Sequence, residues 1–366
     1  MEQSGKRILY AVLNWGYGHT IHAFPLIDFL NQYHEVIFAA DGQAMILLRR
    51  RFPQNLCVPM KDVRIRYSKH KVFMPFSLLL QAVKMLLGLR REHQLTQNLV
   101  KHLKIDRIIS DNRYGVWNKR VPSYLITHQL RFHMPIHTME PLSIFFNRMV
   151  FKGFTGVWVL DSPDNEQNLS GKLTHENALS SHPKVRFMGL WSDLVPRTVE
   201  EDIDLLAILS GPEPQRTMLE NILLKQMPLL PGKKVLVRGV ETSLPLNQED
   251  IILFDFVDRE RMNDLIARSR MVLCRSGYTS TMDLVRMGKK AIMIPTPGQT
   301  EQEYQAELYH KRGWFYTVSQ NALALSKDIQ AAQKFEPPNL SDWFNRTDLL
   351  DDAIRAWPKE LLKIKS

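Results

Sequence analysis

Short apolar runs alternate with longer amphipathic segments along most of the chain. Residues 7–13 form an apolar run that ends in a glycine-rich turn, residues 21–30 repeat apolar side chains at helical spacing, and residues 35–40 form a second apolar run. Short apolar runs bounded by turn residues are typical of buried strands, and a three- to four-residue period is typical of helices. The first half continues with predicted strands and one long helix, at 107–109, 123–127, 157–160 and 185–188 and at 75–102.

The second half repeats the alternation after a polar, turn-rich stretch at 189–203. Its predicted strands lie at 205–209, 234–237, 251–254, 271–273 and 291–294, and its predicted helices at 215–227, 261–268, 279–287 and 301–312. Strands that alternate with helices are typical of parallel α/β sheets. We therefore predict an α/β protein with two Rossmann-like domains, over 1–195 and 200–335. Residues 336–366 are predicted to be a linker and a helical tail that packs back on the first domain.

The composition is that of a soluble globular protein. Of the 366 residues 44% are apolar and 23% charged, which argues against disorder and against a fibrous repeat. Cys57 and Cys274 are too few for a disulfide framework or a cysteine-rich zinc site, and they fit a reducing compartment. The N-terminal stretch lacks the layout of a signal peptide, and no 18 apolar residues run without a charge. We expect a cytoplasmic enzyme or binding protein.

Positive charge is concentrated in the first half. Residues 1–183 hold 23 Lys and Arg against 13 Asp and Glu, which gives +10, whereas residues 184–366 hold 25 of each. Such a charge favours an anionic partner: a nucleic acid, a phosphorylated substrate or an anionic membrane surface. A basic face that serves solubility alone is the alternative. In either case, the two halves are expected to meet different partners.

A glycine-rich turn and an acidic residue close two strands of the first sheet. Gly16, Gly18 and His19 follow the first strand, and Asp111 follows the strand at 107–109. Glycines at such a turn let the backbone approach a ligand, but the turn lacks the third glycine of a dinucleotide fingerprint. Ligand sites of open α/β sheets lie at the carboxyl ends of strands, so His19 and Asp111 could form a general base with its carboxylate. Alternatively, Asp111 caps a following helix.

Further polar residues follow the strand at 123–127. His128 and Gln129 end this strand and are expected at the same sheet edge. His133 and His137 have a spacing that invites a zinc site, but Pro135 lies between them and no matching acidic ligand is evident. We therefore expect no metal ion there.

Three segments of the second half are candidate ligand loops. Ser210 and Gly211 precede a helix that carries Arg216, at whose N-terminus a phosphate could bind; a helix start capped by Ser210 is the alternative. Residues 274–280 supply an arginine and hydroxyl groups, with Asp283 one turn further on. Such groups suit a diphosphate and a ribose. Residues 295–304 form a Pro/Gly loop with side chains that could bind a sugar, Gln302 and Glu303.

The segment from Val272 through Arg275, Ser276 and Gly277 to Asp283, followed by Pro295 and Gln302-Glu303-Tyr304, resembles the donor site of the GT-B glycosyltransferases. The similarity is greatest to the family 28 group, which includes the peptidoglycan lipid-linked N-acetylglucosaminyltransferases. The turn at Gly16–His19 and Phe256-Val257-Asp258 also fit, so the resemblance extends in order along nearly the whole chain. It implies two domains that face a central cleft, an N-terminal acceptor domain and a C-terminal nucleotide-sugar donor domain.

The resemblance implies a role for each matching residue. His19 is the expected base, assisted by Asp111, and the Val257 backbone meets the nucleobase. Asp283 is expected to bind the ribose, and Gln302 and Glu303 are expected to contact the sugar. His128 and Gln129 are the expected acceptor contacts. The remaining candidates for the donor, mainly its diphosphate, are Gly16, Gly18, Ser210, Gly211, Arg216, Arg275, Ser276, Gly277 and Thr279. The implied reaction is inverting, needs no cofactor or metal ion and uses a nucleotide diphosphate sugar, with a UDP-sugar as the first candidate.

Three departures bear on the donor sugar and the fine mechanism. The usual Gly-Gly-Ser loop reads Ser-Gly-Pro-Glu at 210–213, the second glutamine of the sugar-reading pair is Glu303, and the arginine often found three residues after the histidine is His22. Two rival functions stay open at this point: a nucleotide-sugar epimerase of the same fold, and a non-catalytic basic binding protein for RNA. Aromatic residues are sparse among residues 42–131, where positive charge is densest, so we expect no nucleic acid partner.

The apolar segment 72–89 bears on the acceptor. Basic residues flank it on both sides, so it could lie on an anionic membrane, although a buried core helix has the same composition. The charge and this segment together favour an anionic or lipid-linked acceptor. They also favour a peripheral position on the inner face of the cytoplasmic membrane.

Overall fold

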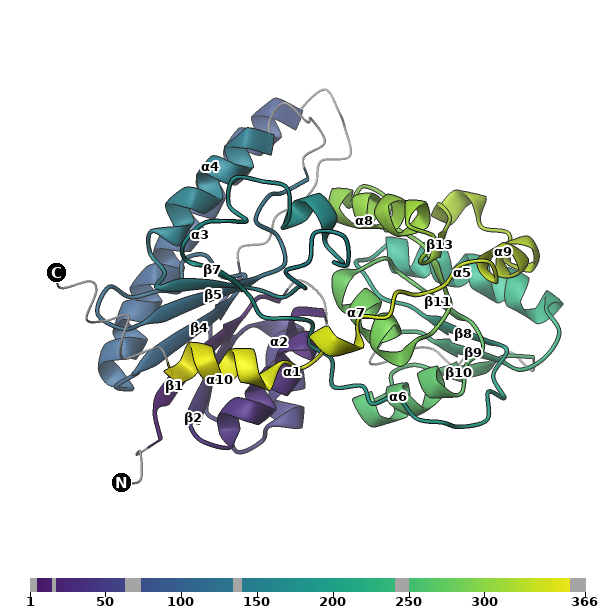
Figure 1. The fold of residues 1–366 in the computed structure, drawn as a ribbon, viewed down its shortest axis with the longest axis horizontal. Helices are drawn as coiled ribbons and strands as arrows, with labels where there is room; N and C mark the ends of the chain where they lie inside the picture. Colours follow the sequence, from purple (N-terminus) through teal and green to yellow (C-terminus); the bar gives the residue numbers. More distant parts are fainter. Residues whose placement is uncertain (1–4, 15–17, 63–73, 134–139, 241–249, 356–366) are drawn as a thin grey trace.

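Two parallel β-sheets form the centres of two α/β domains in the computed structural model (Figure 1). The structure describes residues 5–14, 18–62, 74–133, 140–240 and 250–355. The predicted fold class, α/β with two Rossmann-like domains, is confirmed.

The first sheet has seven strands in the order β3-β2-β1-β4-β5-β6-β7, with every neighbouring pair parallel. Helices cover both of its faces, which is why all residues from Ile8 to Val12 are buried and apolar. The elements of this domain are β1 (Arg7–Val12), α1 (Gly18–Asn31), β2 (Glu35–Ala40), α2 (Gly42–Arg51), β3 (Cys57–Pro59), α3 (Met74–His102), β4 (Arg107–Asp111), β5 (Ser123–Thr127), α4 (Glu140–Phe151), β6 (Gly156–Val159) and β7 (Val185–Phe187).

The second sheet has six strands in the order β10-β9-β8-β11-β12-β13, again all parallel. Its elements are β8 (Leu205–Ile208), α5 (Gln215–Gln226), β9 (Lys234–Val237), β10 (Ile252–Phe254), α6 (Arg259–Ala267), β11 (Val272–Cys274), α7 (Tyr278–Met287), β12 (Ala291–Met293), α8 (Thr300–Lys311), β13 (Tyr316–Thr317) and α9 (Leu325–Ala332). A last helix, α10 (Thr347–Arg355), follows the domain.

Two capping alternatives from the sequence are wrong. Asp111 is the last residue of β4 and is followed by a turn, so it caps no helix. Helix α5 begins at Gln215 with Pro214 at its N-cap position, which leaves Ser210 four residues outside the cap. Asp111 therefore lies at the carboxyl end of a strand and Ser210 in the loop after one, where open α/β sheets bind ligands.

The chain crosses between the domains twice. It passes to the second domain after β7 and returns before α10, and the two crossing segments are joined where Leu190 pairs with Phe344. The Asn345 side chain accepts from the Ser192 backbone N–H and donates to its carbonyl. Leu350 and Ala353 of α10 are buried in the core of the first domain, so the tail packs back on that domain.

Each sheet has one point at which the strand order reverses. In the first sheet β1 and β4 are neighbours at this point, and in the second sheet β8 and β11 are. Connections leave such a pair of strands in opposite directions and open a crevice at their carboxyl ends. Helices α1 and α7 follow one strand of each pair and contact each other, so the two crevices lie at the interface between the domains (Figure 1).

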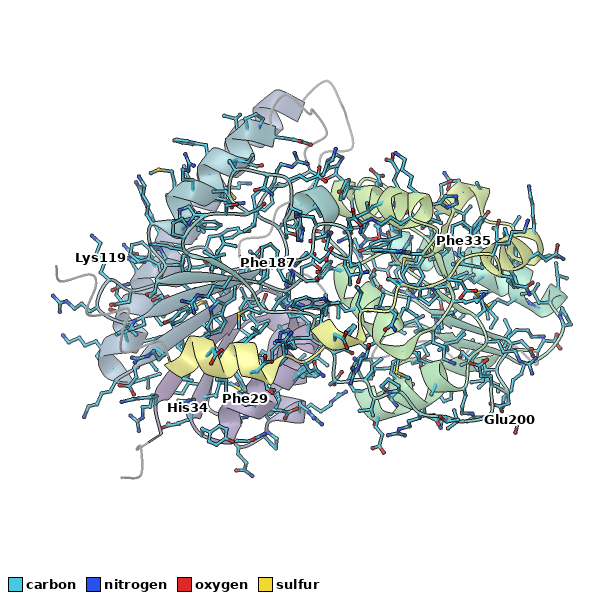
Figure 2. The ribbon with its side chains drawn as sticks, viewed as in Figure 1. Phe29, His34, Lys119, Phe187, Glu200 and Phe335 are labelled. Atoms are coloured by element: carbon cyan, nitrogen blue, oxygen red, sulfur yellow. The ribbon has the colours of Figure 1, made fainter. Side chains whose placement is uncertain are left out.

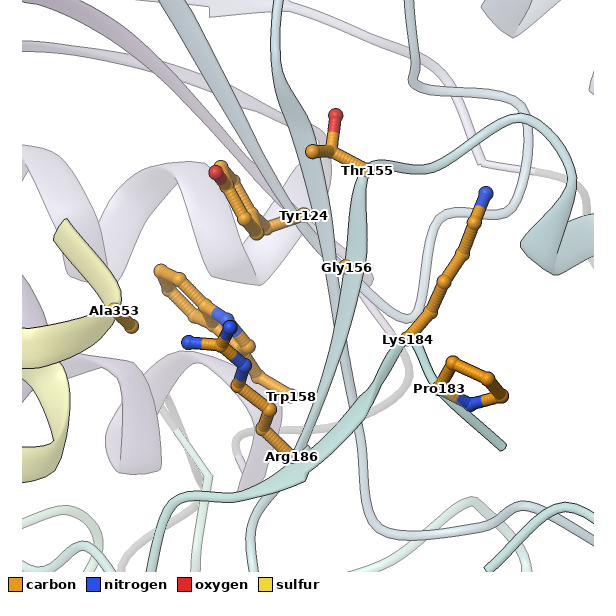
Figure 3. Close-up of a pocket in the computed structure, with 8 residues that line it drawn as sticks. All are labelled: Tyr124, Thr155, Gly156, Trp158, Pro183, Lys184, Arg186 and Ala353. Carbon is orange, nitrogen blue, oxygen red and sulfur yellow. The ribbon is translucent and has the colours of Figure 1, made fainter. Parts of the chain in front are cut away.

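Figure 2 shows the side chains of the two domains, with Lys119 towards one end of the molecule and Glu200 towards the other. A small cavity between Trp158, Arg186 and Ala353 has a volume of about 30 Å³, which is too small for a sugar (Figure 3). In the part of the chain that the structure describes, no helix is long and apolar enough to cross a membrane.

Candidate active site between the two domains

His19 and Asp111 are brought together at the reversal point of the first sheet. His19 lies in the first turn of α1, and Asp111 ends β4, where its backbone is in register with Val12 of β1. The His19 Nδ1 atom lies 3.2 Å from Asp111 Oδ1. The Asp111 side chain is fully buried, whereas that of His19 is 15% exposed. A histidine whose Nδ1–H donates to a carboxylate keeps its Nε2 unprotonated, which is the arrangement of a general base.

The charges of this pair stabilise each other. Burial would lower the pKa of His19, but the hydrogen bond to Asp111 and its negative charge outweigh burial and raise that pKa above its ordinary value. Burial would likewise raise the pKa of Asp111, but the two neighbouring histidines hold it well below its usual range. Asp111 is therefore a carboxylate at neutral pH, and it can stabilise an imidazolium that forms on His19.

A second histidine shares the same carboxylate, which the sequence analysis did not foresee. His22 Nε2 lies 2.7 Å from Asp111 Oδ2, and the His22 side chain is 3% exposed. Burial lowers the pKa of His22, so its ring is neutral at neutral pH. In the sequence analysis, His22 was noted only because it replaces an arginine of the family pattern. It lies one turn after His19, however, which places both rings on one face of α1.

His128 joins the site from β5 and contacts the second domain. Its ring lies 5.8 Å from that of His19, and its Nε2 atom is 2.9 Å from Glu301 Oε1 on α8. Burial would raise the pKa of Glu301, but the nearby His128 holds it below its ordinary value. The Gln129 amide nitrogen lies 3.3 Å from His128 Nε2. The sequence placed His128 and Gln129 at this edge but missed Glu301, because its neighbours Gln302 and Glu303 matched the family pattern instead.

The loop after β8 lies close to two buried polar atoms without hydrogen-bond partners among the described residues. Gly211 has a φ of +99°, and a Cβ atom there would lie 3.5 Å from Thr296 Oγ1 and 4.0 Å from Arg275 Nε. Both of these atoms are buried and have no hydrogen-bond partner among the described residues. The open side of Gly211 therefore faces a guanidinium nitrogen and a hydroxyl group.

Arg275 is a buried cation without a carboxylate partner among the described residues. It is 1% exposed, and its other nitrogens donate to the carbonyl oxygens of Gln215, Ile294 and Pro295 and to the side chain of Gln320. Burial lowers the pKa of Arg275 to about 10. An uncompensated buried charge is costly, so this site favours an anionic ligand.

Several other predicted donor residues of the second domain have contacts within that domain. Ser276 donates to the carbonyl of Gln302, whose side-chain oxygen accepts from the backbone N–H of Thr296. The Glu303 carboxylate accepts from the N–H of Gly298. Arg216 pairs with Glu213 and Glu220, and Gly277 is the N-cap of α7. Val257 is half-buried against the core of the second domain. Gly16 lies outside the described residues, as does His137.

Asp283 has different partners from those that the resemblance implied. One of its oxygens accepts from the Ser192 hydroxyl at 2.6 Å and the other from Arg259 at 2.9 Å. Arg259 also pairs with Asp193, and the two carboxylates outweigh burial and raise its pKa further. Asp283 thus fastens α7 to the segment that connects the domains, and its role toward a ribose stays a prediction.

A cavity of about 290 Å³ opens between the domains beside Gly211. The first domain contributes Asn14 and Gln43, and the second contributes Gly211, Glu213, Arg216, Gly239 and Val240. The Gln43 side-chain oxygen is buried and has no hydrogen-bond partner among the described residues. The cavity approaches the lower end of the size range of ligand pockets. Sequence patterns gave no signal for Asn14 or Gln43, because neither belongs to a motif.

Among the described residues, one group of side chains is spaced closely enough to bind a metal ion together: His19, His22 and Asp111. Their ligand atoms lie within 4.8 Å of one another. The distances of 3.2 and 2.7 Å from the two histidines fit hydrogen bonds to one carboxylate, and no fourth histidine, cysteine or carboxylate joins the group among the described residues. The hydrogen-bonded arrangement accounts for all three side chains.

Each half of the chain contains a segment that matches a known protein family. Residues 225–343 match the glycosyltransferase family 28 C-terminal domain, and residues 6–141 match glycosyl transferase family 1. The chain is a family 28-like glycosyltransferase of the GT-B fold. One match covers His19 and Asp111 and the other covers Arg275, so the candidate site residues come from both matched segments.

Three individual proteins illustrate the similarity of this glycosyltransferase. An uncharacterized glycosyltransferase of Methanosarcina acetivorans is 22% identical over 84% of each chain. A UDP-N-acetylglucosamine–N-acetylmuramyl-(pentapeptide) pyrophosphoryl-undecaprenol N-acetylglucosamine transferase of Caldanaerobacter subterraneus is 27% identical over 25% of each chain. The crystal structure of the calicheamicin glycosyltransferase CalG4 superposes with a TM-score of 0.62 at 12% identity, covering 98% of this chain and all of that one. The last comparison shows the shared fold alone.

Proposed function

We propose that this glycosyltransferase moves a sugar from a nucleotide diphosphate sugar to an anionic, lipid-linked acceptor, with inversion and without a metal ion. The observation that carries the donor part is the buried Arg275 guanidinium, which lacks a carboxylate partner among the described residues and faces the open side of Gly211. A diphosphate would supply the missing negative charge. A UDP-sugar is the first candidate, because a similar enzyme carries that donor in its name.

The proposed reaction is a single displacement. His19 accepts the proton of the acceptor hydroxyl, whose oxygen bonds to the anomeric carbon from the side opposite the diphosphate. The bond between that carbon and the diphosphate oxygen then breaks, and the configuration inverts. Arg275 and the backbone N–H groups at the start of α7 stabilise the charge that develops on the leaving diphosphate. Asp111 stabilises the imidazolium of His19 during the step.

A nucleotide screen tests the donor. We expect UDP to raise the melting temperature of the protein more than other nucleoside diphosphates do, and EDTA to leave this stabilisation unchanged. Incubation with a panel of nucleotide sugars and a polyprenyl-phosphate or polyprenyl-diphosphate acceptor should then release UDP and a glycosylated lipid. Absence of stabilisation by every nucleotide would overturn the donor assignment. Stabilisation that EDTA abolishes would overturn the metal-independent mechanism.

The acceptor part of the proposal is supported by the surface of the first domain. That half of the chain carries the whole net charge of +10. Leu142, Phe145 and Met149 of α4 are exposed at a spacing of three and four residues, so they lie on one face of that helix. Leu86 and Leu87 of α3 are exposed as well. An apolar surface on a basic domain suits an amphiphilic acceptor at the inner face of the cytoplasmic membrane.

Sedimentation with lipid vesicles tests the acceptor side. We expect binding to vesicles that contain phosphatidylglycerol, weaker binding at high salt, and none to neutral vesicles, because each basic residue near an anionic surface contributes about 1 kcal/mol. Leu86→Asp and Phe145→Asp should weaken binding, whereas Met218→Asp, at an exposed position of the second domain, is the matched control. The side chain of Leu79, within the predicted membrane segment, lies outside the described residues. Absence of binding at low salt would favour a soluble anionic acceptor.

A further inference from the structure

The Asp111 carboxylate is held by a histidine on each of its oxygens. Oδ1 faces His19 Nδ1 at 3.2 Å and Oδ2 faces His22 Nε2 at 2.7 Å. A carboxylate bound through both oxygens cannot turn about its terminal bond without losing a hydrogen bond. The shorter contact to His22 therefore fixes the direction in which Oδ1 points toward His19.

The partners of His22 also define its protonation. Because Asp111 is ionised, the contact at Oδ2 requires a proton on His22 Nε2. The neutral ring then has an acceptor at Nδ1, and the Thr279 hydroxyl lies 3.4 Å from that atom. Thr279 is the second residue of α7, in the donor domain. His22 thus lies between the catalytic carboxylate and the helix whose N-terminus we assign to the donor diphosphate.

The two helix starts approach closely at this point. A Cβ atom at Gly18 would lie 3.0 Å from Thr279 Oγ1, so a larger residue at position 18 would displace this hydroxyl. Because His22 and Thr279 belong to different domains, their contact requires that the two domains lie against each other.

We propose that His22 is a positioning residue of the transfer reaction, which orients Asp111 toward the base His19 and links that carboxylate to Thr279 of the donor domain. The proposal rests on the proposed role of His19 and goes beyond it, because the pair of His19 and Asp111 alone does not require a second histidine. Because the His22 side chain is only 3% exposed, its proposed action is through Asp111.

Several groups set the charge state of the two histidines from the elements packed around them. They are Asp111 on β4, Glu301 on α8, Asp62 after β3 and His128 after β5. Removing the hydrogen bond that His22 donates leaves all of them in place. The negative charge of Asp111 then acts more strongly on His19, which should raise the pKa of His19 further.

Three variants separate this role from a packing role. His22→Phe fills the space of the ring without a donor, His22→Gln restores an N–H near the position of Nε2, and Thr279→Val removes only the hydroxyl. We expect His22→Phe to lower kcat roughly 10- to 100-fold at pH 7 with little change in the donor KM, and to move the acid limb of the pH profile upward. His22→Gln should return the limb to its original position and recover most of kcat.

Nitrogen NMR of ¹⁵N-histidine-labelled protein measures the same shift without substrate. We expect the titration midpoint of His19 to rise in His22→Phe, to rise less in Thr279→Val, and to return in His22→Gln. An equal loss of activity at every pH, with an unchanged His19 midpoint, would overturn the proposal and make His22 a packing residue. An unchanged midpoint in Thr279→Val would overturn the link to the donor domain. If no nucleotide sugar is turned over by the unaltered protein, the proposed function fails while the NMR result still decides the role of His22.

Discussion

The imidazole ring of His128 and the phenol ring of Tyr278 stack across the domain interface, with ring centres 4.6 Å apart and planes inclined by 12°. His128 follows a strand of the first sheet, and Tyr278 is the first residue of α7 in the second domain. The Tyr278 hydroxyl also donates to the carbonyl of Leu160 in the first domain. These contacts place the start of α7 against the site that holds His19, so the structure represents a closed arrangement of the two domains.

Replacing His19 with alanine should lower kcat roughly 10²- to 10⁴-fold, which is the usual contribution of a general base. UDP affinity should change little, because the diphosphate is assigned to Arg275 and Gly211 in the other domain. Steady-state kinetics and titration calorimetry measure the two quantities. A collapse of UDP affinity with a modest loss of kcat would place His19 in the donor site and require another base.

The pH dependence should follow the state of His19. The base acts when it is neutral, so kcat/KM should rise with pH through the raised pKa of His19 and level off above it. Asp111→Asn removes the negative charge that raises this pKa and leaves burial, which lowers it. The acid limb should therefore move to lower pH while the plateau falls. A limb that stays in place or moves upward would contradict the assignment of Asp111 as the partner of His19.

Glu301→Gln should loosen the closed arrangement. The change removes the charge that pairs with His128 across the interface, so we expect a larger radius of gyration by solution X-ray scattering before UDP is added. Glu307→Gln on the same helix is the control, because Glu307 is exposed and pairs with Lys311 of the same helix. Identical scattering curves for both variants would show that the ion pair does not hold the domains together.

Arg275→Gln should weaken UDP binding roughly 10- to 100-fold, because a hydrogen bond to a charged group contributes about 1.5–3 kcal/mol. The melting temperature of the free protein should stay the same or rise, since the variant removes a buried cation without a carboxylate partner among the described residues. Arg270→Gln serves as the control, because Arg270 is exposed and pairs with Asp204. A strongly destabilised protein with normal UDP affinity would make Arg275 a structural residue.

Asp283→Asn distinguishes two roles of this carboxylate. The substitution breaks the pair with Arg259, so we expect a loss of stability near the lower end of roughly 3–5 kcal/mol, because Asp193 still pairs with that arginine. Denaturant unfolding measures this loss, with Asp348→Asn as an exposed control. A large loss of UDP affinity without a loss of stability would instead favour the ribose contact that the family resemblance implies.

The fold could be predicted because the patterns that indicate strands and helices involve residues that are close together in the chain. Alternating apolar strands and amphipathic helices predicted most elements of both sheets, whereas the two-residue strand β13 and the three-residue strand β3 are too short to show a period. Asp111 and His19 were predictable as a pair because parallel strands bring their carboxyl ends to one edge. Glu301 and the contact of His22 with Thr279 were not, because they depend on how one domain lies against the other. The partners of Asp283 were missed for the same reason.

The paired crossing segments at Leu190 and Phe344 determine how the domains can move. Because Leu190, Ser192 and Asn345 tie the outgoing and returning segments together, neither can bend independently of the other. The two domains also meet at the ion pair between His128 and Glu301. A chain shortened before α10 would keep Phe344 and Asn345 but would expose the apolar surface that Leu350 covers on the first domain. Removing the last helix would thus destabilise the first domain more than the second domain, which precedes this helix in sequence.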